Sequence, residues 1–154
     1  MTTTPIAEPV TGRQALGDLD EPIQALAQFY RAFNNRDLAL MADNWDNADD
    51  VAMDNPLGGI VRGWPEIRAV YERIFSGRGR VQVEFHDYTV HRHGDVFYAV
   101  GRERGTYEAA DLKLELAIRT SRVFRRVNNR WRQAHHHGSI DDPRLLDTYR
   151  RAVR

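Results

Sequence analysis

The chain has 154 residues, no cysteine, and 22 basic against 22 acidic side chains, so its formal net charge is zero. This composition excludes disulfides, thiolate nucleophiles and cysteine-zinc sites, and it gives no overall field toward nucleic acid or a membrane. The length predicts one domain. No apolar run approaches the roughly 20 residues that span a bilayer, and residues 1–19 lack the pattern of a secretion signal. We therefore expect a cytoplasmic protein.

The charges are distributed unevenly along the chain. Residues 1–61 hold 3 basic and 10 acidic side chains, whereas residues 119–154 hold 10 basic and 3 acidic ones. The arginines of the second segment alternate with core-type residues and do not form a separate basic stripe. We therefore expect the two ends to meet in the fold or across a dimer, and we do not expect a nucleic-acid partner.

The first half of the chain predicts helices. Residues 1–19 are rich in Thr, Pro and Gly and predict a mobile tail, and Asp20 is placed to cap a helix. Apolar residues at helical spacing follow as Ile23, Leu26, Ala27, Tyr30 and Phe33, and then as Leu38, Met41, Ala42 and Trp45. Residues 51–54 and 60–61 predict a short hairpin. A third helix is expected from Pro65 to Gly77.

From Val81 the pattern changes to the period of two that is typical of strands. We expect strands at 81–92, 95–107, 112–127 and 130–139, joined by turns at His93-Gly94, Ala109-Ala110-Asp111 and Asn128-Asn129. A short helix after Asp142-Pro143 ends the chain. Helices first and strands later predict an α+β fold with a curved antiparallel sheet, in one domain over residues 20–154.

Two of these strands carry an apolar row that becomes basic. The even positions of one read Val96, Tyr98, Val100, Arg102 and Arg104, and those of the next run from Leu112 through Thr120 and Arg122 to Phe124. Because alternate residues of a strand share a face, this pattern indicates a cavity with apolar walls and a cationic patch.

Two stretches resemble the nuclear transport factor 2-like superfamily, in particular its SnoaL-like members. One runs from Trp45 to Phe75 and includes Asn55-Pro56. The other contains Arg122-Val123-Phe124-Arg125-Arg126, Arg130-Trp131-Arg132 and His135-His136-His137-Gly138-Ser139. The superfamily also includes ketosteroid isomerase and the association domain of calmodulin-dependent kinase. The resemblance covers about residues 20–140 and is specific for the fold more than for the function, because this fold hosts many chemistries.

The resemblance implies a cone-shaped, cystatin-like sheet wrapped around a pocket, closed by the N-terminal helices, with the outer sheet face used for a homodimer. The even positions of the last three strands would face inward, namely Arg102, Arg104, Thr120, Arg122, Ala134 and His136. The odd positions Trp131, Gln133, His135 and His137 would lie on the convex, dimer side.

The resemblance to ketosteroid isomerase and to the kinase association domain implies roles for individual residues. Tyr30 matches the oxyanion donor of ketosteroid isomerase, but Asn55 occupies the position of its base, and the second acid falls near Thr120. An amide cannot abstract a proton, which argues against that activity. Arg102 and Arg122 match two carboxylate-binding arginines of the kinase hub, whereas Gly138 replaces a third.

Each candidate also has a structural interpretation. Arg102 and Arg122, with Arg104 beside them, could hold a carboxylate. Alternatively they could pair internally with Glu103, Glu115 or Asp54, or lie in water at the open rim of the cavity. Tyr30 could bind a ligand oxygen or the nearest backbone, and Asn55 could orient a ligand or shape the turn before Pro56. Thr120 would face the ligand. We expect Trp45 and Tyr71 to form the pocket wall.

The histidines suggest two kinds of chemistry. His136, alone on the inner face, is the candidate general acid or base, and its alternative is a hydrogen-bonded core histidine. His91 with His93 and His135 with His137 each share a strand face, but a zinc site usually needs a third ligand and the two strands are not expected to be neighbours. We therefore expect no metal and no cofactor.

These observations favour a homodimeric small-molecule-binding domain whose ligand has an apolar body and an anionic or carbonyl group. The corresponding enzyme would be a cofactor-independent acid/base isomerase, cyclase or dehydratase, with His136, Tyr30 and Asn55 at the reacting group. The alternative is a non-catalytic homo-oligomerisation or ligand-sensing module built on the same cone.

Overall fold

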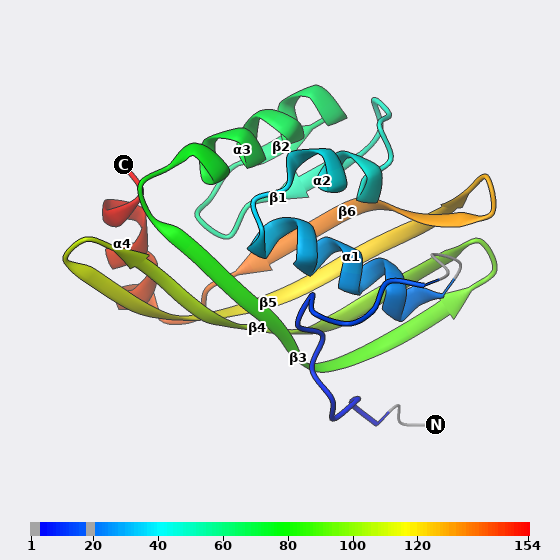
Figure 1. The fold of residues 1–154 in the computed structure, drawn as a ribbon, viewed down its shortest axis with the longest axis horizontal. Helices are drawn as coiled ribbons and strands as arrows, with labels where there is room; N and C mark the ends of the chain where they lie inside the picture. Colours follow the sequence, from blue (N-terminus) through cyan, green and yellow to red (C-terminus); the bar gives the residue numbers. More distant parts are fainter. Residues whose placement is uncertain (1–3, 18–20) are drawn as a thin grey trace.

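A computed structural model describes residues 4–17 and 21–154. The α+β prediction is confirmed: within these residues four helices accompany one six-stranded sheet (Figure 1). The elements are α1 (Pro22–Asn34), α2 (Leu38–Asn44), β1 (Ala52–Asp54), β2 (Ile60–Arg62), α3 (Trp64–Ser76), β3 (Arg80–His93), β4 (Val96–Ala109), β5 (Leu112–Val127), β6 (Arg130–Ser139) and α4 (Pro143–Ala152). No helix of the described part is long and apolar enough to cross a membrane.

The sheet has the order β2-β1-β6-β5-β4-β3 and is antiparallel except for the parallel pair β1 and β6. The four long strands fall within two residues of their predicted bounds. Asn128 and Asn129 both have positive φ, 50° and 64°, as the predicted two-residue hairpin requires. Figure 1 shows α1, α2 and α3 over one face of the curved sheet and α4 at one end, beside the β4–β5 hairpin.

The bend of the sheet depends on glycine in β4. A Cβ atom placed on Gly105 would lie 1.8 Å from the backbone carbonyl oxygen of Gln82 in β3, and one on Gly101 would lie 2.6 Å from Cβ of Tyr88. β3 also carries an irregularity between His86 and Thr89, where Asp87 has a φ of 51°. These features allow the two strands to approach and curl around α1.

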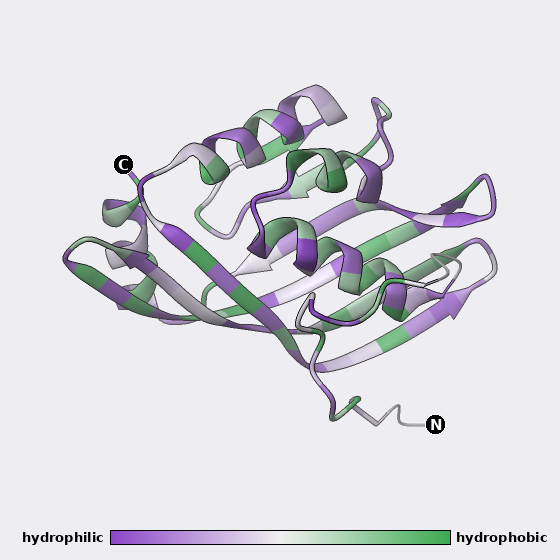
Figure 2. Ribbon diagram, viewed as in Figure 1, coloured by the Kyte–Doolittle hydropathy of each residue, from purple (hydrophilic) through white to green (hydrophobic). Residues whose placement is uncertain are grey.

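The long strands alternate in hydropathy (Figure 2). The burial of individual side chains shows that β4 presents the opposite face from the one predicted. Its odd positions are buried, including Phe97, Ala99, Glu103 and Tyr107, while Val96, Tyr98 and Val100 are 38–43% exposed. The prediction that Arg102 and Arg104 face inward is therefore wrong. Both rows of β4 contain apolar residues, and in the buried row Phe97 packs on Trp131 of β6 and Tyr107 on Tyr149 of α4.

β5 follows the predicted alternation, with Thr120 and Arg122 buried on the concave face. In β6 the alternation shifts, because Val123 pairs with His135 whereas Phe124 pairs with Gln133, which leaves Ala134 as an extra residue. Trp131 and Gln133 are consequently fully buried, so their predicted place on the dimer side is wrong, and so is the inward pairing position of Ala134. His136 faces inward as predicted.

The N-terminal segment and α1 form one side of the core. Where a mobile tail was expected, Val10 is 1% exposed, and Ile6 and Val10 pair with Tyr88 and Phe85 of β3. The carbonyls of Gly12 and Gln14 then accept hydrogen bonds from Arg31 of α1. The predicted cap Asp20 lies outside the described residues. Ile23 is 41% exposed, although the helical spacing placed it on the buried face.

The uneven charges meet within one chain, as expected. Arg125 of β5 contacts Asp46 and Asp50 at 2.7 Å each, and Arg130 of β6 contacts Asp43 at 2.9 Å. The basic C-terminal strands thus pair with the acidic segment around α2.

Candidate functional site

A cavity of about 1000 Å³ lies between the concave face of the sheet and the helices α1, α3 and α4. Its wall is mainly apolar and aromatic, with contributions from Phe29, Phe33, Met53, Val70, Tyr71 and Ile118. Such a cavity is large enough for a drug-sized organic molecule. The polar side chains among its lining residues include Asn55, Glu103, Arg122 and His136.

Arg122 is the charged centre of the cavity, and it already has an acidic partner. The residue is 1% exposed; its Nη2 donates to Oε2 of Glu103 at 2.7 Å and its Nη1 donates to Oε1 of Gln133 at 2.8 Å. The guanidinium carbon lies 3.5 Å from the ring centre of Phe29. The internal pairing with Glu103, one of the two interpretations left open, is therefore the one observed.

Arg102 lies on the other face of the sheet. Its side chain is 49% exposed and its Nε is 3.3 Å from Oδ2 of Asp87. Arg104 is exposed on the same convex face, and neither residue lines the cavity. The predicted convergence of two arginines on a ligand carboxylate is wrong, because β4 presents its other row of side chains to the interior.

Tyr30 forms hydrogen bonds with both members of the ion pair. Its hydroxyl donates to Oε2 of Glu103 at 2.7 Å and lies 3.4 Å from Nε of Arg122. Burial, with the negative charge of Glu103 adding to it, raises the pKa of this phenol well above its usual value. Tyr30 is fully buried and is not among the cavity-lining residues, so it orients Glu103 and does not face the cavity.

His136 is buried in the cavity wall with one unused nitrogen. The residue is 6% exposed, and its Nδ1 has no hydrogen-bond partner. Burial, together with the positive charge of Arg122, holds the pKa of His136 well below its usual value, although the backbone carbonyl of Ser121 opposes this effect. The imidazole is therefore neutral near pH 7 and can accept or donate one hydrogen bond.

The remaining predicted residues divide between wall and core. Oδ1 of Asn55 accepts a hydrogen bond from the backbone nitrogen of Leu57 at 2.8 Å, so Asn55 both shapes the turn and lines the cavity. Tyr71 forms part of the wall, and burial raises its pKa to about 12. Trp45 and Thr120 are buried in the core and do not line the cavity.

The sequence interpretation missed Glu103 as a cavity residue. Glu103 is 6% exposed, lines the cavity and binds both Tyr30 and Arg122. The signal available was the odd row of β4, in which Glu103 follows Phe97 and Ala99 and precedes Tyr107. A row with two aromatic rings and one carboxylate is typical of a core that pairs a buried charge.

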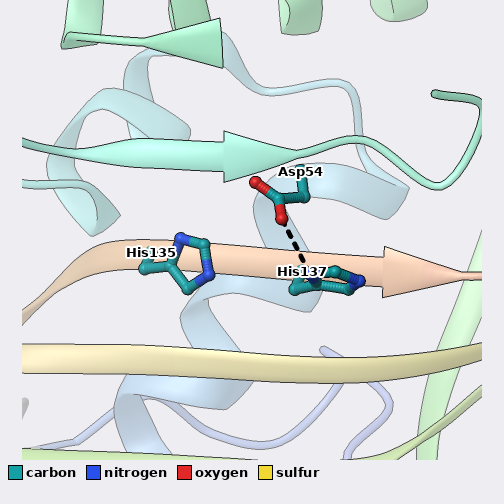
Figure 3. Close-up of side chains that lie close together, drawn as sticks. All are labelled: Asp54, His135 and His137. Carbon is teal, nitrogen blue, oxygen red and sulfur yellow. Dashed lines mark ion pairs between the residues drawn. The ribbon is translucent and has the colours of Figure 1, made fainter. Parts of the chain in front are cut away.

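The convex face brings together a second group of polar residues. Nδ1 of His137 lies 2.8 Å from Oδ2 of Asp54, and His135 lies beside them (Figure 3). As expected, the strands of the two histidine pairs, β3 and β6, are not neighbours in the sheet. The parallel pairing of β1 with β6 nevertheless brings a third potential ligand, Asp54, to His135 and His137. Two imidazoles and a carboxylate are side chains able to hold a metal ion.

Comparison with known sequences gives one family. A sequence model of the SnoaL-like domain matches residues 23–143, which is most of the chain. Among curated proteins no sequence matches this chain.

Solved structures share the fold. A candidate calcium/calmodulin-dependent protein kinase type II association domain from Thiobacillus denitrificans is 28% identical, with a TM-score of 0.66 over 84% of this chain and 100% of that one. A candidate dehydratase of the nuclear transport factor 2-like family from Streptomyces avermitilis is 22% identical, with a TM-score of 0.68 over 75% and 89%. A ketosteroid isomerase-like protein from Erwinia carotovora atroseptica is 18% identical, with a TM-score of 0.63 over 77% and 92%.

Proposed function

We propose that this chain, which belongs to the SnoaL-like family, binds a small molecule with an apolar body and a carbonyl or hydroxyl group in its cavity and performs cofactor-independent acid/base chemistry on it. The observation that carries the proposal is Nδ1 of His136, a buried nitrogen without a hydrogen-bond partner in the wall of the cavity. A buried polar atom without a partner is costly, and a ligand atom would satisfy it.

The arrangement favours a neutral oxygen on the ligand over a carboxylate. The charge of Arg122 is balanced by Glu103 at 2.7 Å, so a bound carboxylate would place a second negative charge beside a pair that is already neutral. A guanidinium has five N–H groups, and the contacts with Glu103, Gln133 and Tyr30 engage three of them. The N–H groups that these contacts leave unused can donate hydrogen bonds to an oxyanion that develops during the reaction.

The proposed reaction is a proton transfer next to the carbonyl. Nδ1 of His136 takes the proton from the α-carbon, the electron pair of the C–H bond moves into the carbonyl, and an enolate forms beside Arg122. In a β,γ-unsaturated ketone, return of the proton from His136 to the γ-carbon gives the conjugated isomer. In a β-hydroxy ketone, His136 gives the proton to the β-hydroxyl as its C–O bond breaks, so water leaves and the enolate becomes the conjugated ketone. Both steps balance without an oxidant or reductant. The kinship with proteins described as dehydratase and isomerase-like is consistent with this class of reaction.

Binding can be tested with three probes of one carbon skeleton: 2-decalone, decalin-2-ol and decalin. We expect the ketone and the alcohol to raise the melting temperature of the wild type more than the hydrocarbon does, and His136→Leu to abolish that difference. His91→Leu, a histidine replacement on the convex face, should keep it. Equal shifts for all three probes, or a difference that persists in His136→Leu, would contradict the proposal.

We also propose a homodimer formed through the convex face of the sheet. Three large apolar side chains are exposed at alternate positions of β4, namely Val96, Tyr98 and Val100. An isolated domain would place polar residues there. The alternative of a non-catalytic oligomerisation hub is less favoured. Such a hub would have a filled or shallow cavity, whereas about 1000 Å³ is open here.

A further inference from the structure

The short parallel ladder between β1 and β6 places three metal-ligating side chains on the convex face. Its register pairs Ala52 with His135, Met53 with His136 and Asp54 with His137. Because alternate residues of a strand point to opposite faces, Met53 and His136 line the cavity while Asp54, His135 and His137 face outward. One potential ligand atom from each of these three lies within 4.8 Å of the others, and no other such trio occurs in residues 4–17 and 21–154.

We propose that Asp54, His135 and His137 form a binding site for a divalent transition-metal ion on the convex face, separate from the cavity. Figure 3 shows the two imidazoles projecting from β6 toward the carboxylate of β1. Imidazole nitrogen with one carboxylate oxygen suits Zn²⁺ and its first-row neighbours, whereas Mg²⁺ and Ca²⁺ prefer oxygen ligands alone.

His135 is oriented in the manner of a metal ligand. Its Nδ1 lies 2.9 Å from the backbone carbonyl oxygen of Ala52, to which it donates, so Nε2 carries the free lone pair. Metal-binding histidines commonly use one nitrogen in this way and ligate with the other, because the hydrogen bond fixes both tautomer and ring orientation. The parallel β1 strand thus supplies the supporting carbonyl and, two residues later, the carboxylate.

The second contact has nearly the separation of two ligands on one ion. Oδ2 of Asp54 and Nδ1 of His137 are 2.8 Å apart. Two atoms bound at about 2.1 Å to the same ion lie roughly 3.0–3.4 Å apart for bond angles of about 90–109°. A metal ion would replace the hydrogen that the pair now shares. The side chains of His137 and Asp54 are 52% and 32% exposed, so they have room to adjust and the ion has an open path from solvent.

Three protein ligands leave at least one position of the ion for water. His136, which lies between the two histidine ligands in sequence, points to the opposite side of the sheet and lines the cavity. Metal binding and the proposed chemistry at His136 are therefore separate properties, and either can be disproved without the other.

The test is a Co²⁺ and Zn²⁺ titration of the full chain, purified without a polyhistidine tag and freed of metal by chelation. We expect one ion per chain, with Co²⁺ giving the visible absorption bands of a site of low coordination number, and competition by Zn²⁺ removing them. His135→Ala and the nearly isosteric Asp54→Asn should each weaken binding by more than about 100-fold, beyond the range typical of changes outside the ligand shell.

The matched control is the double variant His91→Ala with His93→Ala, which removes the other pair of histidines sharing a strand face. It should bind the ion as the wild type does. Melting temperatures in chelator, equal for all variants, would show that the fold is intact. Absence of stoichiometric binding by the wild type, unchanged affinity in Asp54→Asn, or loss of binding in the His91 and His93 variant would each overturn the proposal.

Discussion

At the scale of the residue, Arg122 and Glu103 form a buried ion pair in the wall of the cavity. Their side chains are 2% and 8% exposed, and the contact between them is 2.7 Å. A buried charge without its partner is strongly destabilising, whereas an apolar pair of similar volume is often tolerated. The pair therefore neutralises the cationic patch that the sequence predicted, and Tyr30 and Gln133 hold it in place.

Replacement of Glu103 by Leu should lower the free energy of unfolding by about 3–5 kcal/mol, since Arg122 would remain buried and uncompensated. The double variant Glu103→Leu with Arg122→Met should recover at least half of that loss. Urea denaturation measures both. Arg102→Met, which removes a pair that is half exposed, should change stability by less than about 1 kcal/mol. A double variant as unstable as the sum of the single ones would contradict the coupling.

Tyr71 gives a prediction in alkaline solution. Its pKa is about 12 in the folded chain because of burial, against about 10 in an unfolded chain. The unfolded chain therefore releases this proton first, so stability is constant below pH 10 and falls as the pH rises toward 12, by roughly 2 kcal/mol from this residue. Denaturation midpoints from pH 8 to 11.5 should fall less steeply in Tyr71→Phe. Identical slopes would show that the phenol is not sealed from water.

At the scale of the element, a chain of buried polar groups joins the helices to the sheet. Asn44 of α2 donates to the carbonyl of Ala25 in α1 and accepts from Nε2 of Gln133 in β6, which in turn accepts from Arg122 in β5. The shift of β6 at Ala134 is what turns both Gln133 and His136 inward. Without that extra residue, one of the two would lie on the convex face.

The close approach of β3 and β4 predicts that a side chain is not tolerated at Gly105. Gly105→Ala should destabilise the fold by about 3 kcal/mol or more, because the added Cβ would lie 1.8 Å from a backbone oxygen of β3. Thermal unfolding measures the loss. Gly17→Ala is the matched control, since its Cβ would meet only a side-chain oxygen at 3.8 Å. A Gly105→Ala variant as stable as the control would mean that the strands do not approach as described.

The bounds of the long strands could be predicted from the sequence, whereas the orientation of β4 could not. The period of two located β3 to β6, and Asn128-Asn129 marked their last turn, because these signals are local. The orientation of β4 is not a local property, because its even row also resembles a core row. Tertiary packing selects the odd row, in which Phe97 contacts Trp131 of β6 and Tyr107 contacts Tyr149 of α4.

The candidate site could be predicted only in part, because some of its residues are placed by local alternation and others by contacts between distant segments. His136 and Arg122 were placed inward correctly, because the alternation of β5 holds throughout and that of β6 holds after its bulge. Glu103 was missed with the face of β4. The trio of Asp54, His135 and His137 depends on the parallel register of two strands about 80 residues apart, which no local pattern specifies.

At the scale of the whole molecule, the two sheet faces have separate roles. The concave face encloses the cavity, while the convex face exposes an apolar row on β4 and the histidines of β6. We propose that the concave face binds the ligand and that the convex face forms the dimer.

Tyr98→Asp should convert the proposed dimer to a monomer, because a charge in the centre of the apolar row would be buried without a partner. Sedimentation velocity gives the mass directly. Ala117→Asp places the same charge at another exposed position of the convex face, away from the row, and should leave the mass unchanged. A wild type that is already monomeric, or a Tyr98→Asp variant that stays dimeric, would contradict the assignment of this face.

The central claim is that His136 transfers a proton to and from a molecule held in the cavity. The direct measurement is deuterium incorporation at the α-carbons of 2-decalone in D₂O, followed by NMR with the full chain in chelator. We expect exchange above the buffer rate, lowered by about 100-fold or more in His136→Gln and retained in His91→Gln. Exchange at the buffer rate with the ketone bound, or equal exchange in His136→Gln, would contradict it.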